Sequence, residues 1–372
     1  MIYLDNAATS FPKPREVIDD LNFCLKKYCG NSGRSSHALS VKTSEKIYES
    51  REEIADFLGF CAPEQVVFTY NATYALNIAI KSFVSEKCHI LTSDFEHNSV
   101  IRPLEKLKNQ LGVEYSAINT EGDVLSNLRE NLRPDTKGLI ASIASNVTGD
   151  SLPLQVMSDF AKENGLFLIV DGSQAVGHQN IDLTKTPCDA FCAPGHKALF
   201  GIQGSGFICF KDKYPKDSLI EGGSGTDSKS PIMPQILPEG YEAGTLAAPA
   251  IISLGSGVRF IKKIRLCEIE ARLDMLTDGI KERLCSVDGV KMYKSGIGLL
   301  SFNLLDIPSS CLAMELDKYG ICTRGGLHCA PSIHKKIGTL EQGAVRISFS
   351  YFNNMGEVDR LYRAVKEIRK DL

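Results

Sequence analysis

Apolar and polar positions follow one another along the chain in blocks that predict alternating strands and helices. Short, mostly apolar runs have the length of strands, and the segments between them repeat their apolar residues with helical spacing. Strands are predicted at 65–70, 89–94, 137–146 and 166–172 and within 189–197 and 204–210, and helices at 71–84, 97–112 and 154–165. Strands separated by such helices are typical of βαβ units and predict a mainly parallel sheet.

The predicted strands are apolar at nearly every position, which is typical of a sheet covered on both faces. Residues 220–245, rich in Gly, Ser and Pro, predict a loop or linker. A long helical run then extends to about residue 288. Shorter strands and a final helix are predicted at 291–295, 298–305, 344–350 and 354–372. The fold class is therefore α/β, with a large domain over 16–250 and a smaller α+β domain over 251–372 that residues 1–15 join.

The composition is that of an ordinary globular enzyme. The 372 residues are 43% hydrophobic and 23% charged, with a net charge of -3, so no strong field favours nucleic acid or an anionic membrane. No apolar run reaches the ~18 residues of a membrane span. The N-terminus lacks the basic and apolar regions of a secretion signal. We therefore expect a cytoplasmic protein that binds neither nucleic acid nor membrane.

Twelve cysteines in a chain without an export signal predict reduced thiols. None belongs to a C-x-x-C pair, so no metal site is expected. Apolar neighbours, as around Cys209 in "FICF", predict that roughly ten of the twelve are small buried hydrophobes. Cys329 stands apart, because it lies in "RGGLHCAP" behind two glycines and a histidine.

Asp171 and Lys197 are the residues that first indicate a cofactor. Asp171 ends an apolar strand in "VDGSQAVGH", and Lys197 lies in the Gly-flanked turn "APGHKALFG". Ligand-binding groups gather at such strand ends in α/β folds. A lysine that binds the cofactor covalently and a carboxylate that pairs with its ring nitrogen suit pyridoxal phosphate. For these two residues taken by themselves, a capping aspartate and a solvated lysine explain the pattern equally well.

Other predicted strand ends carry polar residues that suit the same cofactor. Ala72 and Thr73 open a helix, where N–H groups and a hydroxyl hold phosphate well, although threonine is also a common helix cap. His97 could stack on a ring and move protons, or be a histidine at a helix entry. Asn146 could donate to a ring hydroxyl. The convergence of five strand ends on one cofactor carries more weight than any single residue.

The motifs, in their order and spacing, resemble those of the class V aminotransferase superfamily of fold-type I pyridoxal phosphate enzymes. Within it they are most similar to the Suf-like cysteine desulfurases and selenocysteine lyases. The similarity runs nearly end to end. The motifs that carry it are "YLDNAATSFPKP", "HALS", "NATYALN", "EHNS", "SNVTG", "VDGSQAVGH", "GHKALFG", "EAGT", "RGGLHCAP" and "VRISFSYFNN". The resemblance implies a fold-type I architecture and a homodimer.

The resemblance also implies a role for each matching residue. The residues implied to bind the cofactor are Ala72, Thr73, His97, Asn146, Asp171, Gln174, His196, Lys197 and Thr245. Ala72, Thr73 and His196 would hold the phosphate, and Thr245 would reach the phosphate in the other subunit. Asp171 would pair with the ring nitrogen, Gln174 would lie beside the ring 3-hydroxyl, and His97 would stack on the ring face.

Substrate binding and catalysis are implied in the same way. Arg346 would pair with the substrate carboxylate, near Asn146, and Arg34 would lie at the pocket edge. Lys197 would take the Cα proton, and the Cys329 thiolate would attack the substrate sulfur, with alanine as product. A free thiol has a pKa near ~8.5, so a basic neighbour such as His328 or Arg324 is expected to favour the thiolate.

Three positions depart from the family pattern. Pro194 stands where a phosphate-binding serine is common, Gly33 where a pocket histidine is common, and Leu327 replaces the first of two histidines before the cysteine. The last two bear on the choice of substrate more than on the type of reaction.

The sequence therefore predicts a cysteine desulfurase, which would cleave L-cysteine to L-alanine and pass the Cys329 persulfide to a sulfur-acceptor protein. A selenocysteine lyase acting on L-selenocysteine would use the same site. A class V transaminase would not need Cys329. The intact set of Lys197, Asp171 and His97 argues against a non-catalytic sulfur-relay scaffold.

Overall fold

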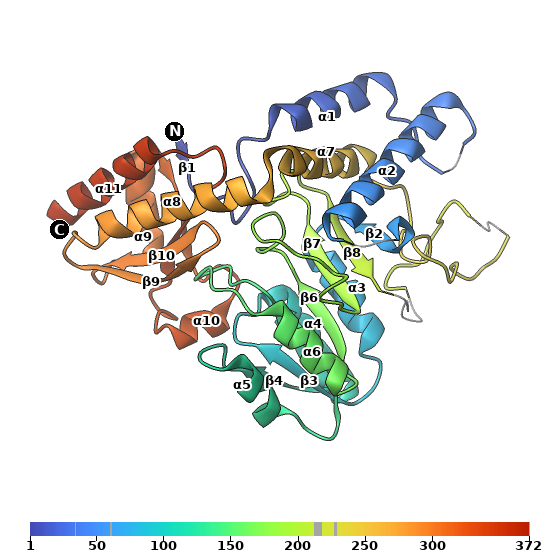
Figure 1. The fold of residues 1–372 in the computed structure, drawn as a ribbon, viewed down its shortest axis with the longest axis horizontal. Coiled ribbons are helices and arrows are strands. Elements are labelled where there is room, and N and C mark those ends of the chain that lie inside the picture. The colour runs from blue at the N-terminus through green and yellow to red at the C-terminus, as the bar shows by residue number, and fades with distance from the viewer. Residues whose placement is uncertain (34, 60–61, 212–217, 227–228, 372) are drawn as a thin grey trace.

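A mainly parallel sheet forms the larger part of the protein (Figure 1). The computed structural model describes residues 1–33, 35–59, 62–211, 218–226 and 229–371, and within them this sheet has seven strands in the order β2-β8-β7-β6-β5-β3-β4. They are β2 Val66–Thr69, β3 His89–Ser93, β4 Glu114–Ile118, β5 Thr136–Ser142, β6 Phe167–Asp171, β7 Ala190–Pro194 and β8 Gly206–Phe210. Strand β8 runs antiparallel to β2 and β7, and the other neighbouring pairs are parallel. The predicted α/β class and mainly parallel sheet are confirmed.

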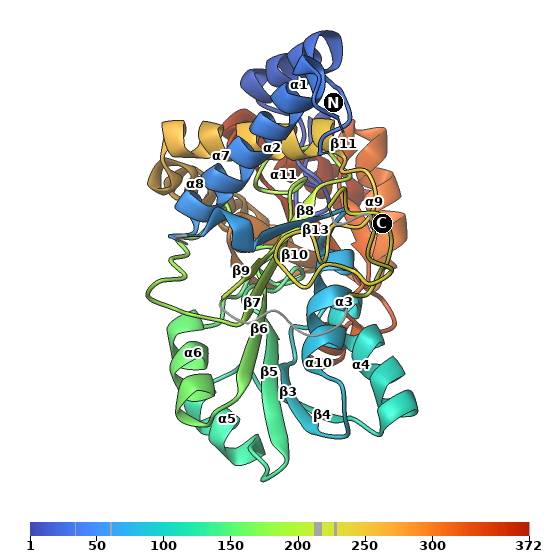
Figure 2. The same cartoon turned by 90° about the vertical axis from the view of Figure 1, so that its right-hand side faces the viewer.

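Helices cover both faces of this sheet, as the apolar strands predicted. Figure 2 shows α3 and α4 on one side of the sheet and α5 and α6 on the other. Along β6, Ile169 packs in the core beneath α3 and α4, whereas Leu168 and Val170 pack in the opposite core. The helices of this part are α1 Arg15–Lys27, α2 Ala38–Phe57, α3 Ala72–Phe83, α4 Asn98–Leu111, α5 Val124–Asn131, α6 Leu154–Glu163 and α7 Ala248–Ile264, with a 3-10 turn at Pro63–Gln65. None of the described helices is long and apolar enough to cross a membrane.

The smaller part is built on an antiparallel sheet in the order β12-β13-β10-β9. Its elements are α8 Leu266–Leu284, β9 Val290–Gly296, β10 Leu299–Leu304, α9 Ser309–Lys318, β11 Ile321–Cys322, β12 Arg324–Gly326, α10 Pro331–Lys336, β13 Ala344–Ser348 and α11 Met355–Lys370. The N-terminal strand β1, Ile2–Tyr3, pairs in parallel with β11. The chain therefore begins on the smaller part and crosses to the larger one at α1.

The helical run predicted from residue 250 to 288 is two helices rather than one. Helix α7 ends at Ile264 and α8 begins at Leu266, and Arg265 between them has a φ of 77°. A positive φ is incompatible with continuing a right-handed helix. Helix α7 packs on α1 and α2, whereas α8 packs on β9 and α11. The break turns the chain from the larger part to the smaller one. The domain limits predicted from the sequence, 16–250 and 251–372, stay a prediction.

The prediction that about ten cysteines are buried is wrong. Among the eleven described cysteines, Cys322 is half-buried. Five are buried, namely Cys24, Cys88, Cys188, Cys192 and Cys209, and five are exposed, namely Cys29, Cys267, Cys285, Cys311 and Cys329. Cys267 and Cys311 lie on helices whose apolar neighbours face the opposite side. Neighbours along the sequence indicate burial for a strand in a covered sheet, but not for an amphipathic helix. Cys61 lies outside the described residues.

Two glycines let the larger and smaller parts meet backbone to backbone. Gly149, in the loop after β5, has a φ of 72°, and a Cβ added there would lie 2.2 Å from the carbonyl oxygen of Gly296 in β9. Overpacking of this kind typically costs about 1–3 kcal/mol, in addition to about 1 kcal/mol for the left-handed backbone. We expect Gly149→Ala to lower the free energy of unfolding by about 3 kcal/mol, measured by denaturant titration.

Gly122→Ala is the matched control for this prediction. Gly122 has a φ of 78°, but its added Cβ would meet open space. Its substitution therefore isolates the backbone cost, about 1 kcal/mol. Equal losses of stability in the two variants would contradict the close approach of Gly149 to Gly296.

Candidate active site

The carboxyl ends of the parallel strands open into a cavity of about 210 Å³. Strands β3, β5, β6 and β7 all direct their carboxyl ends to this edge of the sheet, where ligands bind in α/β folds. The predicted site residues that line the cavity are Ala72, Thr73, His97, Asn146, Asp171, Gln174, His196, Lys197 and Arg346. The structure thus brings together residues that the sequence spreads over 275 positions, from 72 to 346.

Asp171 and Lys197 lie at or just past the ends of two neighbouring strands, β6 and β7. Asp171 is the last residue of β6, and its Oδ1 accepts a hydrogen bond of 2.9 Å from the Ser173 N–H. Burial lowers the pKa of Lys197 to about 8, although the charge of Asp171 opposes this shift. An amine with such a pKa is partly neutral near pH 7 and can act as a nucleophile or as a base.

The N-terminus of α3 offers hydrogen-bond donors to an anion. Asn71 caps this helix by accepting the Tyr74 N–H at 3.1 Å, while the N–H groups of Ala72 and Thr73 have no acceptor inside the helix. His196 also lines the cavity, and its buried Nδ1 has no partner among the described residues. Burial lowers the pKa of His196 to about 4, so the ring is neutral. Free N–H groups and the helix dipole together favour a phosphate.

His97 is fixed as a neutral ring at the start of α4. Its Nδ1 accepts the Ser99 N–H at 3.0 Å, which places the ring proton on Nε2. Burial lowers the pKa of His97, so the ring stays uncharged at neutral pH. Ser99 also bonds Thr73 at 2.8 Å between their hydroxyl oxygens. The histidine and the N-terminus of α3 are therefore held by one hydrogen-bond network.

Arg346 is a buried cation shared by three segments. It is 1% exposed, donates to Asp5 Oδ1 at 2.7 Å and donates to the Asn146 carbonyl at 3.0 Å. Its Nε and the Oδ1 of Asn146 are buried without a partner among the described residues. Buried polar atoms normally have partners, so these two atoms indicate a ligand. The protein engages two of the five N–H donors of the guanidinium, and Nε is a further donor that has no partner among the described residues.

The Cys329 loop is docked onto the larger part at the rim of this cavity. The Cys329 carbonyl accepts the Asn98 N–H at 2.8 Å, and the His328 carbonyl accepts from Asn146 Nδ2 at 2.7 Å. His328 and Cys329 have φ values of 49° and 59°, a strain of about 1–3 kcal/mol per residue that is typical of functional loops. The Cys329 thiol is exposed and is not part of the cavity lining.

His328 does not supply the positive charge that the sequence suggested for Cys329. Its side chain is buried, and its Nε2 donates to the Ala344 carbonyl at 2.9 Å. Burial and the charge of Arg346 hold the pKa of His328 well below its usual value, so the ring is neutral. Arg324, the other predicted neighbour, lines the cavity and stays a candidate for this role.

Two predicted residues lie away from the cavity or outside the described chain. Thr245 is exposed and lines a separate hollow with Tyr70 and Tyr74, so its role toward a second subunit stays a prediction. Arg34 lies outside the described residues.

Several lining residues were not predicted from the sequence, among them Ala7, Ala8, Asn71, Ser142 and Ser173. Ala7 and Ala8 belong to the quoted N-terminal motif "YLDNAATSFPKP", which was the available signal. Ser142 and Ser173 carried no signal, because isolated serines are common at strand ends.

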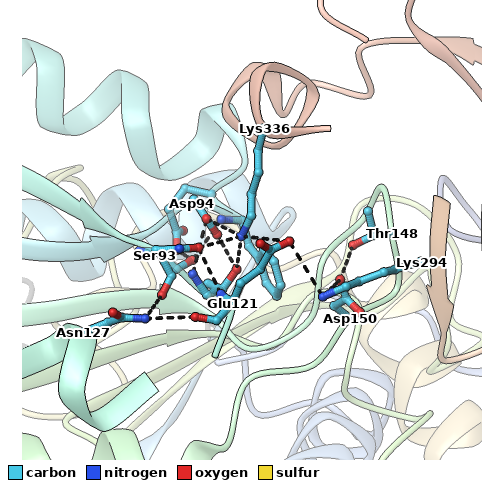
Figure 3. Close-up of polar contacts among 12 residues, drawn as sticks. Ser93, Asp94, Glu121, Asn127, Thr148, Asp150, Lys294 and Lys336 are labelled. Carbon is cyan, nitrogen blue, oxygen red and sulfur yellow. Dashed lines mark hydrogen bonds and ion pairs between the residues drawn. The ribbon is translucent and has the colours of Figure 1, made fainter. Parts of the chain in front are cut away.

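A polar cluster joins the smaller part to the larger one beside this site (Figure 3). We use this name for Asp94, Thr120, Glu121, Asp150, Lys294 and Lys336. Lys336, the last residue of α10, bonds Asp94 Oδ2 at 2.7 Å and Thr120 Oγ1 at 3.0 Å. Lys294 of β9 lies 3.9 Å from both Glu121 and Asp150. The cluster thus fixes α10, which begins two residues after Cys329, against the loop that carries His97.

The comparisons with known proteins decide the family. The family model described as Aminotransferase class-V matches residues 2–361. The chain belongs to this family. The resemblance inferred from the motifs is confirmed.

Relatives within the class V aminotransferase family span nearly the whole chain. A probable cysteine desulfurase of Pyrococcus abyssi is 30% identical, over 100% of this chain and 95% of its own length. One of Vibrio cholerae is 28% identical, over 98% of this chain and 93% of its own length. The apo structure of the cysteine desulfurase from Thermococcus onnurineus has a TM-score of 0.91 at 29% identity, covering 100% of this chain and 95% of that chain.

Lys336→Met tests whether the polar cluster holds the Cys329 loop. The substitution removes the cation that joins α10 to Asp94. We expect the free energy of unfolding to fall by about 1 kcal/mol, the upper end for such ion pairs. We also expect Cys329 to be alkylated faster, as measured by mass spectrometry of its peptide with the exposed Cys311 as internal reference.

Lys335→Met is the control, because it makes the same change on the same helix. Lys335 is exposed and has no ion pair among the described residues. Equal alkylation rates of Cys329 in the two variants would show that the polar cluster does not restrain the loop.

Proposed function

We propose that this protein is a pyridoxal phosphate-dependent cysteine desulfurase, which converts L-cysteine into L-alanine and leaves the sulfur as a persulfide on Cys329. The observation that carries the proposal is the cavity itself. It combines the Lys197 amine, the Asp171 carboxylate and the buried Arg346, and the Cys329 loop is docked at its rim. Membership in the class V aminotransferase family and the named relatives support it.

The donors of the cavity fit pyridoxal phosphate. The first turn of α3 and the unpaired His196 Nδ1 suit the phosphate group. Asp171 suits a protonated ring nitrogen, and the neutral ring of His97 suits stacking on the ring face. When bound, the cofactor supplies an electron sink for the charge that develops at the substrate Cα.

The residues of the chain orient the substrate and move its proton. The unpaired Nε of Arg346 donates to the substrate carboxylate, and the free Oδ1 of Asn146 accepts from the substrate. Lys197 takes the Cα proton, since its lowered pKa leaves part of the amine uncharged near neutral pH.

Cys329 then accepts the sulfur. Its thiolate attacks the substrate sulfur, so that a bond forms between the two sulfur atoms and the bond from sulfur to the substrate Cβ breaks. The electron pair of the broken bond stays with Cβ, which takes up a proton to become the methyl group of alanine. Return of a proton from Lys197 to Cα completes the product. The thiol must enter the cavity from its exposed position on the rim, so the proposal requires a displacement of the loop.

The exposed position of Cys329 also suits delivery of the sulfur. A thiol of an acceptor protein can reach a persulfide at the rim without entering the cavity. A homodimer in which Thr245 approaches the second cofactor, and a cytoplasmic location, belong to the same proposal.

Selenocysteine lyase is the second candidate, and one observation favours it. The Cys329 thiol is not part of the cavity lining, and selenium can leave a substrate without an enzyme thiol.

Formation of alanine tests the function. The protein loaded with pyridoxal phosphate is incubated with L-cysteine and a reductant, beside Cys329→Ala and Cys311→Ala. Cys311 is also exposed but lies on α9, so it controls for loss of a surface thiol. We expect alanine from the wild type and from Cys311→Ala, and a loss of at least about a hundredfold in Cys329→Ala, as for the removal of a catalytic nucleophile.

Other outcomes separate the remaining functions. Alanine formed from L-selenocysteine, but not from L-cysteine, in both wild type and Cys329→Ala would assign a selenocysteine lyase. Transfer of the amino group to a keto acid, without release of sulfur, would assign a transaminase.

A further inference from the structure

A second buried carboxyl group lies behind Asp171 and takes no part in the mechanism above. Glu96 is 0% exposed. Its Oε1 accepts from the Ser93 hydroxyl at 2.5 Å, from the Ser142 N–H at 2.9 Å and from the Ser93 N–H at 3.3 Å. Its Oε2 has one donor among the described residues, the Ser142 hydroxyl at 3.0 Å. The carboxyl group is thus held at the ends of β3 and β5.

Ser142 stands between the two carboxyl groups. Its Oγ lies 3.0 Å from Glu96 Oε2 and 3.4 Å from Asp171 Oδ2. A hydroxyl group has one proton, so Ser142 can donate to either Glu96 or Asp171, but not fully to both. Ser142 and Asp171 are 4% and 5% exposed, so bulk water does not readily replace the missing bond.

We propose that Glu96 is a positioning residue that acts through the Ser142 hydroxyl on Asp171, and so sets how strongly Asp171 holds the ring nitrogen of the cofactor. The proposal rests on the proposed function in one respect, because it takes pyridoxal phosphate as the group that Asp171 faces. It adds a residue that touches neither cofactor nor substrate.

Glu96, Ser142 and Asp171 form a row of hydrogen-bonded groups with two states, which differ by one proton on Glu96. With Glu96 protonated, its Oε2–H donates to Ser142 Oγ, and the Ser142 hydroxyl turns its own proton to Asp171 Oδ2. With Glu96 ionised, Ser142 donates to Glu96, and Asp171 loses that donor and gains a second negative charge nearby. The Asp171 carboxylate binds a protonated ring nitrogen more tightly when Ser142 does not donate to it than when it does. One proton on Glu96 therefore changes the interaction at the cofactor.

The surroundings of Glu96 bring the loss of its proton close to neutral pH. Burial raises the pKa of Glu96 to about 7, and the charge of Asp171 raises it further, while the bonds from Ser93 and Ser142 oppose the shift. The other titratable groups that face this pair do so through Asp171. They are His97 of the β3–α4 loop, Cys192 of β7 and Lys197 after β7. Burial keeps the pKa of Cys192 well above its usual value, so this thiol stays neutral.

The absorption spectrum of bound pyridoxal phosphate tests the proposal without measuring turnover. Spectra are recorded from about pH 5 to about pH 9, a range that spans the shifted carboxyl group. In the wild type we expect a spectral step with a midpoint near pH 7. Glu96→Gln keeps an acceptor for Ser93 and offers an N–H to Ser142, so it imitates the protonated state at every pH. We expect this step to be absent in Glu96→Gln, and identical titrations of the two proteins would overturn the proposal.

Ser142→Ala separates the hydroxyl from the charge. This variant keeps the backbone N–H that bonds Glu96 but removes the hydroxyl that reaches Asp171. We expect the step near pH 7 to shrink. An undiminished step would overturn the part of the proposal that assigns the coupling to Ser142, and this variant also gives a result if Glu96→Gln folds poorly.

Thermal unfolding of the cofactor-free protein gives an independent readout of Glu96. Because the pKa of Glu96 is raised in the folded state, its contribution to stability is fully present below its usual value of 4.5 and is lost as pH rises through about 7. The unfolding temperature of the wild type should therefore fall over this range relative to that of Glu96→Gln. A constant difference between the two proteins would overturn the proposal. A spectral step and a falling difference without any desulfurase activity would support it while refuting the proposed function.

Discussion

The site depends on the buried guanidinium of Arg346. This side chain, on β13 of the smaller part, donates to Asp5 near the N-terminus and to the Asn146 carbonyl of the larger part. A buried cation is stable when its donors are paired, so these bonds favour the arrangement in which the three segments meet. The cavity, which includes residues from all of them, exists because they meet.

Docking of the two parts also explains the position of the Cys329 loop. Hydrogen bonds from Asn98 and Asn146 hold its backbone at one end, and Lys336 holds the helix that follows it. These contacts offset the strain of two consecutive left-handed residues. A loop held by a few contacts against its own strain suits a thiol that must visit the cavity and then return to the surface.

Sequence patterns predicted six of the seven described strands of the parallel sheet, because a strand covered on both faces is an unbroken apolar run. They missed the edge strand β4 and the helix α5 that follows it, since β4 is exposed at Glu114 and Ala117 and is not such a run. They also predicted most of the cavity, since polar residues at parallel strand ends meet at one edge. They missed the break at Arg265, where a backbone angle rather than a breaking residue ends the helix. They gave no role for Glu96, although it opens the quoted motif "EHNS", and no sign of the bond from Asp5 to Arg346, because a charged residue in a loop resembles a solvated one until its long-range partners are known.

The most direct test of the account is to locate the sulfur after one turnover. The holoenzyme is mixed with L-cysteine, its thiols are alkylated at once, and the cysteine-containing peptides are analysed by mass spectrometry. The account predicts a persulfide on Cys329 in amounts equal to the alanine formed, and unmodified sulfur at the other exposed cysteines. Alanine formed without a persulfide on Cys329, or with the persulfide on another cysteine, would contradict it.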